Sequence, residues 1–149
     1  HYLIAGDPSR ALECYNRAIE IDSAVAGYYI NRGNLLQSGG RPDLASEDYI
    51  AALRIDPEDP LIHFNLGNAL RQMGYLEEAS SEYRYALQLD STMADGWLNL
   101  GSCQAQEGRY PEALHCLDRA LQEDSTLETA RNNRLRLIQE MGGSTLSNP

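Results

Sequence analysis

The sequence predicts an all-α fold, an α-solenoid of antiparallel helix pairs, and three observations support this class. First, glycine recurs every 34 residues along the chain, at Gly6, Gly40, Gly74, Gly108 and Gly142. Second, two sets of alanines and one of aspartates follow the same period: Ala11, Ala45, Ala79, Ala113; Ala18, Ala52, Ala86, Ala120; and Asp22, Asp56, Asp90, Asp124. Third, the apolar residues between these markers have helical spacing. A fixed period of this length, without insertion or deletion, is typical of stacked two-helix units.

Each unit is predicted to form two helices. In the central unit they cover about residues 60–73 and 77–89. Gly74 is expected to end the first helix with a positive φ, and Asp90 to end the second. Proline suits the first position of a helix, where its missing N–H would have no partner, and it stands at the start of two second helices, at Pro42 and Pro111.

Small residues are expected where helices approach closely. Gly67 and Ala79 would let the two helices of the central pair pack together, and Ala86 would do the same toward the next unit. Relative to alanine, glycine costs about 1 kcal/mol of helix propensity and asparagine about 0.7 kcal/mol. Asn65 and Asn68 are not expected on the packed side of the helix. Their cost favours a functional role only slightly, because a structural hydrogen bond between helices would offset it as well.

The same residue types stand at the same places in every unit. Residues 94–127 carry Trp97, Leu100, Gly101, Ala113, Leu117 and Ala120. Residues 60–93 carry His63, Leu66, Gly67, Leu70, Ala79, Tyr83 and Ala86. Residues 26–59 carry Tyr29, Gly33, Leu36, Ala45, Tyr49, Ala52 and Pro57. This pattern resembles the tetratricopeptide repeat family, whose motif is Trp-x2-Leu-Gly-x2-Tyr, then Ala-x3-Phe, then Ala and Pro. The resemblance covers residues 1 to about 141 and implies a right-handed superhelix whose concave surface is lined by the first helices.

The period organises the chain as a single domain, residues 1–141, with a tail. A partial repeat covers residues 1–25, and three complete repeats cover residues 26–59, 60–93 and 94–127. A capping helix follows at residues 128–141 and a disordered tail at residues 142–149. The capping helix departs from the motif, with Arg131 at the tryptophan position and Leu135 at the glycine position. A polar end of this kind keeps an open stack soluble.

Charge and cysteine content narrow the class of partner. The chain has 22 acidic and 12 basic residues, a net charge of −10, which argues against nucleic acid and anionic membrane surfaces. No apolar run approaches the roughly 20 residues of a membrane-spanning helix. The odd number of cysteines, Cys14, Cys103 and Cys116, does not form a disulfide framework and favours a cytoplasmic location with reduced thiols.

We find no catalytic pattern, and the chain is predicted not to be an enzyme. Its histidines are His1, His63 and His115, and it contains no HExxH, CxxC or glycine-rich phosphate loop. His63 is expected to pack at an aromatic position. The acidic pairs Glu77–Glu78 and Glu47–Asp48 are attributed to the starts of second helices, where the helix dipole favours negative charge. No metal and no cofactor are expected.

Asparagine also follows the period, at Asn31, Asn65, Asn99 and Asn133. Asn65 lies about 200° around the helix from Gly67, which faces the partner helix, so these asparagines are expected on the opposite face. An asparagine amide can donate to a peptide C=O and accept from a peptide N–H. We therefore predict an asparagine ladder that holds an extended peptide. The side chains expected to flank this peptide are Asn34, Asn68, Arg71 and Arg136.

The partner is therefore predicted to be a protein or an extended peptide segment. Carboxylate-clamp members of the family, which hold the C-terminal Glu-Glu-Val-Asp of heat-shock chaperones, use Lys, Asn, Asn, Lys and Arg at five positions. Those positions here are Ile30, Asn34, Asn65, Asp95 and Asn99. All three cations are missing, which disfavours that ligand. The continuous ladder is more similar to the superhelix of O-linked N-acetylglucosamine transferase and to that of the peroxisomal targeting-signal receptor.

Three alternatives to peptide binding stay open. The asparagines could bridge adjacent helices and be purely structural. The chain could self-associate through the apolar face of the helix at residues 10–21, which would make it a homo-oligomerising scaffold. It could also be the substrate-selecting arm of a larger enzyme such as a glycosyltransferase.

Overall fold

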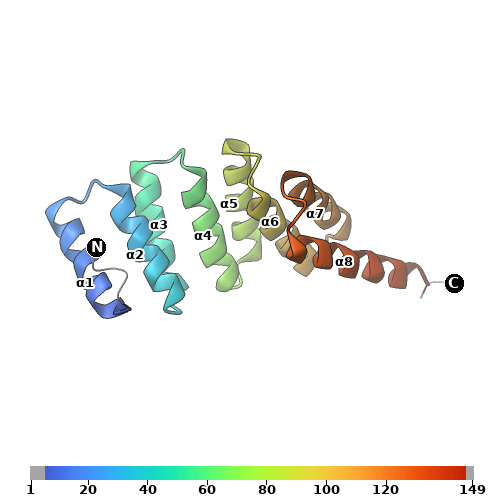
Figure 1. The fold of residues 1–149 in the computed structure, drawn as a ribbon, viewed down its shortest axis with the longest axis horizontal. Helices are drawn as coiled ribbons and strands as arrows, with labels where there is room; N and C mark the ends of the chain where they lie inside the picture. Colours follow the sequence, from blue (N-terminus) through green and yellow to red (C-terminus); the bar gives the residue numbers. More distant parts are fainter. Residues whose placement is uncertain (1–5, 147–149) are drawn as a thin grey trace.

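The computed structural model describes residues 6–146, with side chains described as far as Gly142, and every regular element in this range is a helix. In chain order the helices are α1 (Pro8–Ile21), α2 (Ala26–Ser38), α3 (Pro42–Ile55), α4 (Pro60–Gln72), α5 (Leu76–Leu89), α6 (Ala94–Gln106), α7 (Tyr110–Glu123) and α8 (Glu128–Leu146). Figure 1 shows them side by side in one row, with α1 at one end and α8 at the other. The prediction of an all-α solenoid is confirmed.

The helices pack as consecutive pairs. The pairs α2–α3, α4–α5 and α6–α7 each lie within one 34-residue unit, and each pair also packs against the helix that follows it. The first helices α2, α4, α6 and α8 contact one another directly, whereas among the described residues no second helix contacts another second helix. Because elements approach each other on the inside of a curved stack, the first helices form its inner face.

Four of the periodic glycines have a positive φ, including Gly74, where one was predicted. Gly6, Gly40, Gly74 and Gly108 all have positive φ, between 77° and 88°, which favours glycine because it has no Cβ. Gly142, the fifth member of the series, is not among them, and α8 continues to Leu146. The helix thus extends past residue 141, where the capping helix was predicted to end. Residues 147–149 lie outside the described part.

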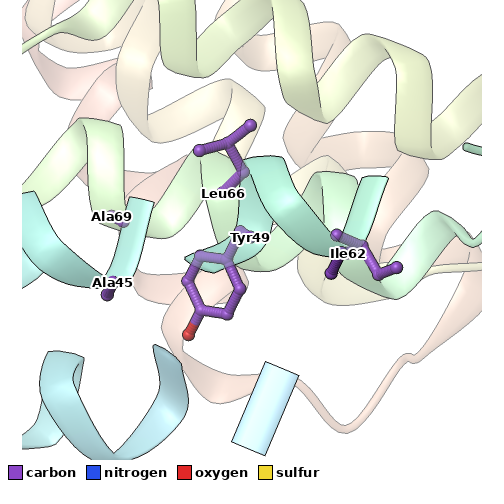
Figure 2. Packing of buried hydrophobic residues seen from close by; sticks show 6 residues of the cluster. Ala45, Tyr49, Ile62, Leu66 and Ala69 are labelled. Atoms are coloured by element: carbon purple, nitrogen blue, oxygen red, sulfur yellow. The ribbon is translucent and has the colours of Figure 1, made fainter. Parts of the chain in front are cut away.

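The close approach predicted at Gly67 is confirmed. A Cβ on Gly67 would lie 2.7 Å from Cε1 of Tyr83, and one on Gly33 would lie 2.8 Å from Cε1 of Tyr49. Both rings are fully buried, and each fills the space that the missing side chain leaves between the two helices of its pair. Figure 2 shows the core around Tyr49, with Ala45, Ile62, Leu66 and Ala69.

Gly67→Ala is expected to lower the free energy of unfolding by about 1–3 kcal/mol, because the new methyl group overpacks a core in which the Tyr83 ring cannot retreat. The matched control is Gly27→Ala in α2, where a Cβ would meet nothing within 4 Å. That change should raise stability by up to about 1 kcal/mol through helix propensity. Urea unfolding followed by circular dichroism measures both, and equal free energies would contradict the close approach.

A partly buried ion pair connects the first three helices. Arg32 of α2 donates from Nε and Nη2 to the two carboxylate oxygens of Asp48 in α3, at 2.9 and 2.7 Å, and from Nη1 to Oδ1 of Asn16 in α1, at 2.9 Å. The Asp48 carboxylate raises the pKa of the Arg32 guanidinium. The attribution of Asp48 to a helix-dipole role is therefore wrong, because this residue lies in the second turn of α3 and faces α2. At the other end of the row Arg134 of α8 donates to Asp118 of α7 at 2.6 Å.

Candidate functional site: the inner face of the solenoid

The asparagine ladder lies on the first helices. Its members occupy the same position of α2, α4, α6 and α8, as Asn31, Asn65, Asn99 and Asn133. Two of them reach back to the preceding first helix: Nδ2 of Asn65 donates to Oδ1 of Asn34 at 3.4 Å, and Nδ2 of Asn99 donates to Oδ1 of Asn68 at 2.9 Å. The predicted flanking asparagines are therefore hydrogen-bonded to the ladder itself.

A tyrosine of the second helix in the same pair completes each of these contacts. The hydroxyl of Tyr49 donates to Oδ1 of Asn34, and that of Tyr83 donates to Oδ1 of Asn68, both at 2.6 Å. The amide oxygen of Asn34 or Asn68 thus accepts one hydrogen bond from the tyrosine of a second helix and one from the asparagine of the following repeat's first helix. We call this three-residue arrangement an amide bridge. The expectation that Asn68 has no packing role is wrong, because the hydroxyl of Tyr83 passes through the helix pair to reach it.

The amide bridges leave specific groups for a ligand. An amide oxygen has two lone pairs and an amide nitrogen two protons. In the bridges Asn34 and Asn68 use their oxygens, so their Nδ2 groups remain as donors. Asn65 and Asn99 use one proton each, so their Oδ1 atoms remain as acceptors, with no hydrogen bond to a described residue. The bridges therefore hold a donor and an acceptor side by side in fixed orientations.

The bridging tyrosines are the residues that sequence reasoning missed. Burial raises the pKa of Tyr49 to about 12, with a further contribution from the charge of Asp48, and burial likewise raises the pKa of Tyr83. A signal for them exists in the sequence, since Tyr49 follows Asn34 by the same 15 residues that separate Tyr83 from Asn68. In the third repeat both partners change together, to Leu117 and Ser102.

The outer members of the ladder are placed differently. Asn31 is exposed, and neither its side chain nor that of Asn133 makes a hydrogen bond to the side chains and backbone described in residues 6–142. Ser102, at the position of Asn34 and Asn68, donates instead to the backbone oxygen of Leu98 in its own helix, at 3.0 Å. The structure thus brings four predicted residues into two bridges and leaves the two end asparagines outside them.

A polar pocket of about 410 Å³ opens across α2, α4 and α6. It is lined by Gln37, Asn68, Arg71, Gln72 and Gln106. Arg71 is partly buried and forms no ion pair with any described residue, although the chain carries 22 acidic side chains. This predicted residue therefore places a cation without a counterion among amide groups. Arg136, the other predicted arginine, is exposed on α8 and lines a separate pocket with Asn133.

The opposite edge of the inner face is apolar and acidic. A pocket of about 220 Å³ there lies at the N-terminal ends of α4 and α6 and is lined by Leu61, Phe64, Met93, Ala94, Asp95, Asp124 and Leu127. Leu61 is 58% exposed, and Asp95 stands at one of the clamp positions where a carboxylate ligand would need a cation. The two edges of the inner face thus differ in polarity.

Other reactive groups do not assemble into a site. Among the residues that the structure describes, no three His, Cys, Asp or Glu side chains could share a metal ion. Burial raises the pKa of Cys116 to about 11 and also raises that of Cys103, so both thiols stay protonated near neutral pH. His63 bonds Glu82 at 2.8 Å and stacks on Tyr85. None of the helices in residues 6–146 combines the length and apolar character needed to cross a membrane.

Family models match most of the chain. A model described as TPR repeat matches residues 33–74 and 67–106, and two models described as tetratricopeptide repeat match residues 94–127 and 2–25. Comparison with curated proteins finds no match.

Solved structures share the fold at low sequence identity. A crystal structure of MamA has a TM-score of 0.88 and 18% identity, covering 92% of this chain and 80% of that chain. The first TPR of Spaghetti (RPAP3), bound to the HSP90 peptide SRMEEVD, has a TM-score of 0.78 and 21% identity, covering 81% and 96%. The TPR domain of Arabidopsis OM64 has a TM-score of 0.76 and 20% identity, covering 77% and 95%.

The helix pairs and their 34-residue period agree with these matches, and the chain belongs to the tetratricopeptide repeat family.

Proposed function

We propose that this chain is a protein-interaction scaffold that binds an extended peptide along its inner face. The observation that supports it best is the pair of amide bridges. They leave an acceptor on Asn65 and Asn99 beside a donor on Asn34 and Asn68. An extended backbone presents N–H and C=O groups that pair with both, without regard to side chains.

The bridges also hold the asparagine side chains in place before a peptide backbone binds. A side chain that is already fixed loses little rotamer freedom on binding, which otherwise costs about 0.5–1.5 kcal/mol per side chain. Successive first helices lie about 8–10 Å apart and an extended chain rises about 3.3 Å per residue, so each ladder position meets about three peptide residues. Arg71 would add attraction for an acidic segment.

The test uses peptides selected from a random 12-residue display library, synthesised with a fluorescent label and measured by anisotropy. The double variant Asn31→Ala with Arg71→Gln removes two inner-face groups that make no bond to a described residue. We expect this variant to bind about 10–30-fold more weakly, since each lost hydrogen-bonding group is worth about 1 kcal/mol. Its unfolding free energy should match that of the parent.

A second variant is Tyr83→Phe, which removes one bridging hydroxyl and keeps every side chain of the inner face. It should lower stability and weaken peptide binding by about 2–10-fold, because the Asn68 amide is held by one bond fewer and must be ordered when the peptide binds. A change of Asn65 and Asn99 to alanine is less informative, because both residues also bridge helices and the double variant loses stability as well as binding. Full affinity in the Asn31/Arg71 variant would show that the peptides bind elsewhere.

A further inference from the structure

The third repeat lacks an amide bridge. Where Tyr49 and Tyr83 fill the first two helix pairs, Leu117 stands in the third, and Ser102 replaces the asparagine that accepts the hydroxyl. A Cβ on Gly101 would lie 3.2 Å from the backbone oxygen of Ala113 and from Cβ of Cys116, and 3.4 Å from Cδ2 of Leu117. Leucine therefore lies farther from its glycine than the tyrosine rings do from theirs, and it has no hydroxyl to reach the inner face. The side-chain amide of Asn133 in α8, which would complete this bridge, makes no hydrogen bond within the described part of the chain.

A pocket of about 260 Å³ lies at this place, between α6 and α8. Its floor is apolar and consists of Gly101, Ala105, Leu117 and Leu137, of which Leu117 and Leu137 are buried. Its polar lining residues are Ser102, Gln106, Asn133, Arg136 and Glu140, so the rim carries one positive and one negative charge. The pocket therefore faces the ladder with groups suited to a peptide backbone and has an interior suited to a hydrocarbon.

We propose that this pocket takes one bulky apolar side chain of a bound peptide, of the leucine or phenylalanine class, while the Asn133 amide pairs with the backbone of that residue. A cavity of about 150 Å³ already accommodates benzene, so the volume is sufficient. A charged side chain is disfavoured, because the floor offers it no hydrogen bond. This proposal rests on the proposed function, since the peptide that supplies the side chain lies along the inner face.

The neighbouring polar pocket extends this preference into a short pattern. Gln106 lines both pockets, and the polar one presents Arg71 without a counterion. Adjacent first helices are about 8–10 Å apart, a distance spanned by about three residues of extended chain. The inner face therefore selects peptides that carry an acidic residue about three positions from a bulky apolar one.

The first experiment tests the pocket alone with a small probe. N-acetyl-phenylalanine methylamide, which carries one apolar side chain and two backbone amides, is titrated against ¹⁵N-labelled protein. We expect saturable amide shifts confined to α6, α7 and α8, and none with N-acetyl-alanine methylamide at the same concentration. Shifts spread over all the first helices, or equal shifts with both probes, would overturn the proposal.

The matched variant fills the pocket from within. Leu117→Tyr with Ser102→Asn should rebuild the third bridge, raise the unfolding free energy and abolish the probe shifts. Asn133→Ala is a second variant, expected to weaken the probe several-fold while the fold persists. Probe binding that is unchanged in both variants would contradict the assignment of this pocket.

Selection from the peptide library separates this proposal from the proposed function. Peptides selected on the parent protein should show an apolar position with an acidic one about three residues away. The Leu117→Tyr/Ser102→Asn protein should lose the apolar preference and keep the acidic one, and Arg71→Gln should do the reverse. Peptides that bind the inner face without the apolar preference would refute the pocket alone, whereas the absence of any inner-face peptide would refute the proposed function.

Discussion

Asp48→Ala is expected to lower the free energy of unfolding by about 2–3 kcal/mol, because Asp48 is buried and its partner Arg32 is partly buried. Removing one partner of a buried ion pair leaves the other charge without compensation. The Arg32 and Asp48 side chains are only 23% and 7% exposed, and the guanidinium bonds both carboxylate oxygens. The same guanidinium also holds α1 through Asn16, so the change loosens three helices.

Asp48→Ala should also destabilise one end of the helix row more than the other. Repeats contact only their neighbours, so a local defect destabilises the repeats around it first. Amide hydrogen exchange should therefore speed up in α1 to α3 before it does in α6 and α7. The control is Asp43→Ala, which breaks the exposed pair with Arg41 and should change stability little. Similar unfolding curves for the two variants would show that burial of Asp48 contributes nothing.

High pH is expected to unfold the protein through its bridging tyrosines. Tyr49 has a folded pKa raised to about 12, and burial raises that of Tyr83 as well, whereas an unfolded tyrosine titrates near 10. A group with a raised folded pKa stabilises the native state fully below its unfolded pKa and loses that contribution as pH rises through the folded pKa. Each tyrosine should therefore cost about 1.4 kcal/mol per pH unit above pH 10.

Urea unfolding at half-unit steps from pH 8 to pH 12 measures this slope. The matched variant is Tyr49→Phe with Tyr83→Phe, which is less stable at pH 8 because two hydroxyl bonds are lost, but whose stability should fall less steeply above pH 10. Cys116 contributes in the same direction between about pH 9 and 11 and is unchanged in the variant. Identical slopes in the two proteins would exclude the tyrosines as the cause.

The period and the helix ends were predictable because they depend on local chemistry. The positive φ of Gly74 and the proline that begins α3 follow from the backbone freedom of single residues. The packing of Gly67 followed from its repetition at the contact face. Local signals disagreed with the outcome at Gly142, which lies inside α8 because the helix continues to Leu146.

The side-chain network was less predictable, because it depends on contacts between distant positions. The link between Arg32 and Asp48 joins residues on different helices, and only the packed pair brings them within 3 Å. The bridging role of Asn68 depends on the length of Tyr83, which the motif treats as an ordinary aromatic core residue. The pocket beside Asn133 lies where the third repeat lacks the bridging tyrosine and asparagine. A search for recurring residues does not reveal a site that depends on missing ones.

The uneven distribution of amide bridges also has a mechanical consequence. Two joints between successive first helices are clamped by a tyrosine and two asparagines, whereas the joint between α6 and α8 has no such clamp. The stiffness of the helix row is therefore not uniform, and force applied to its two ends should separate α6 from α8 first. A peptide bound across α6 and α8 would then stiffen the row at its most compliant contact.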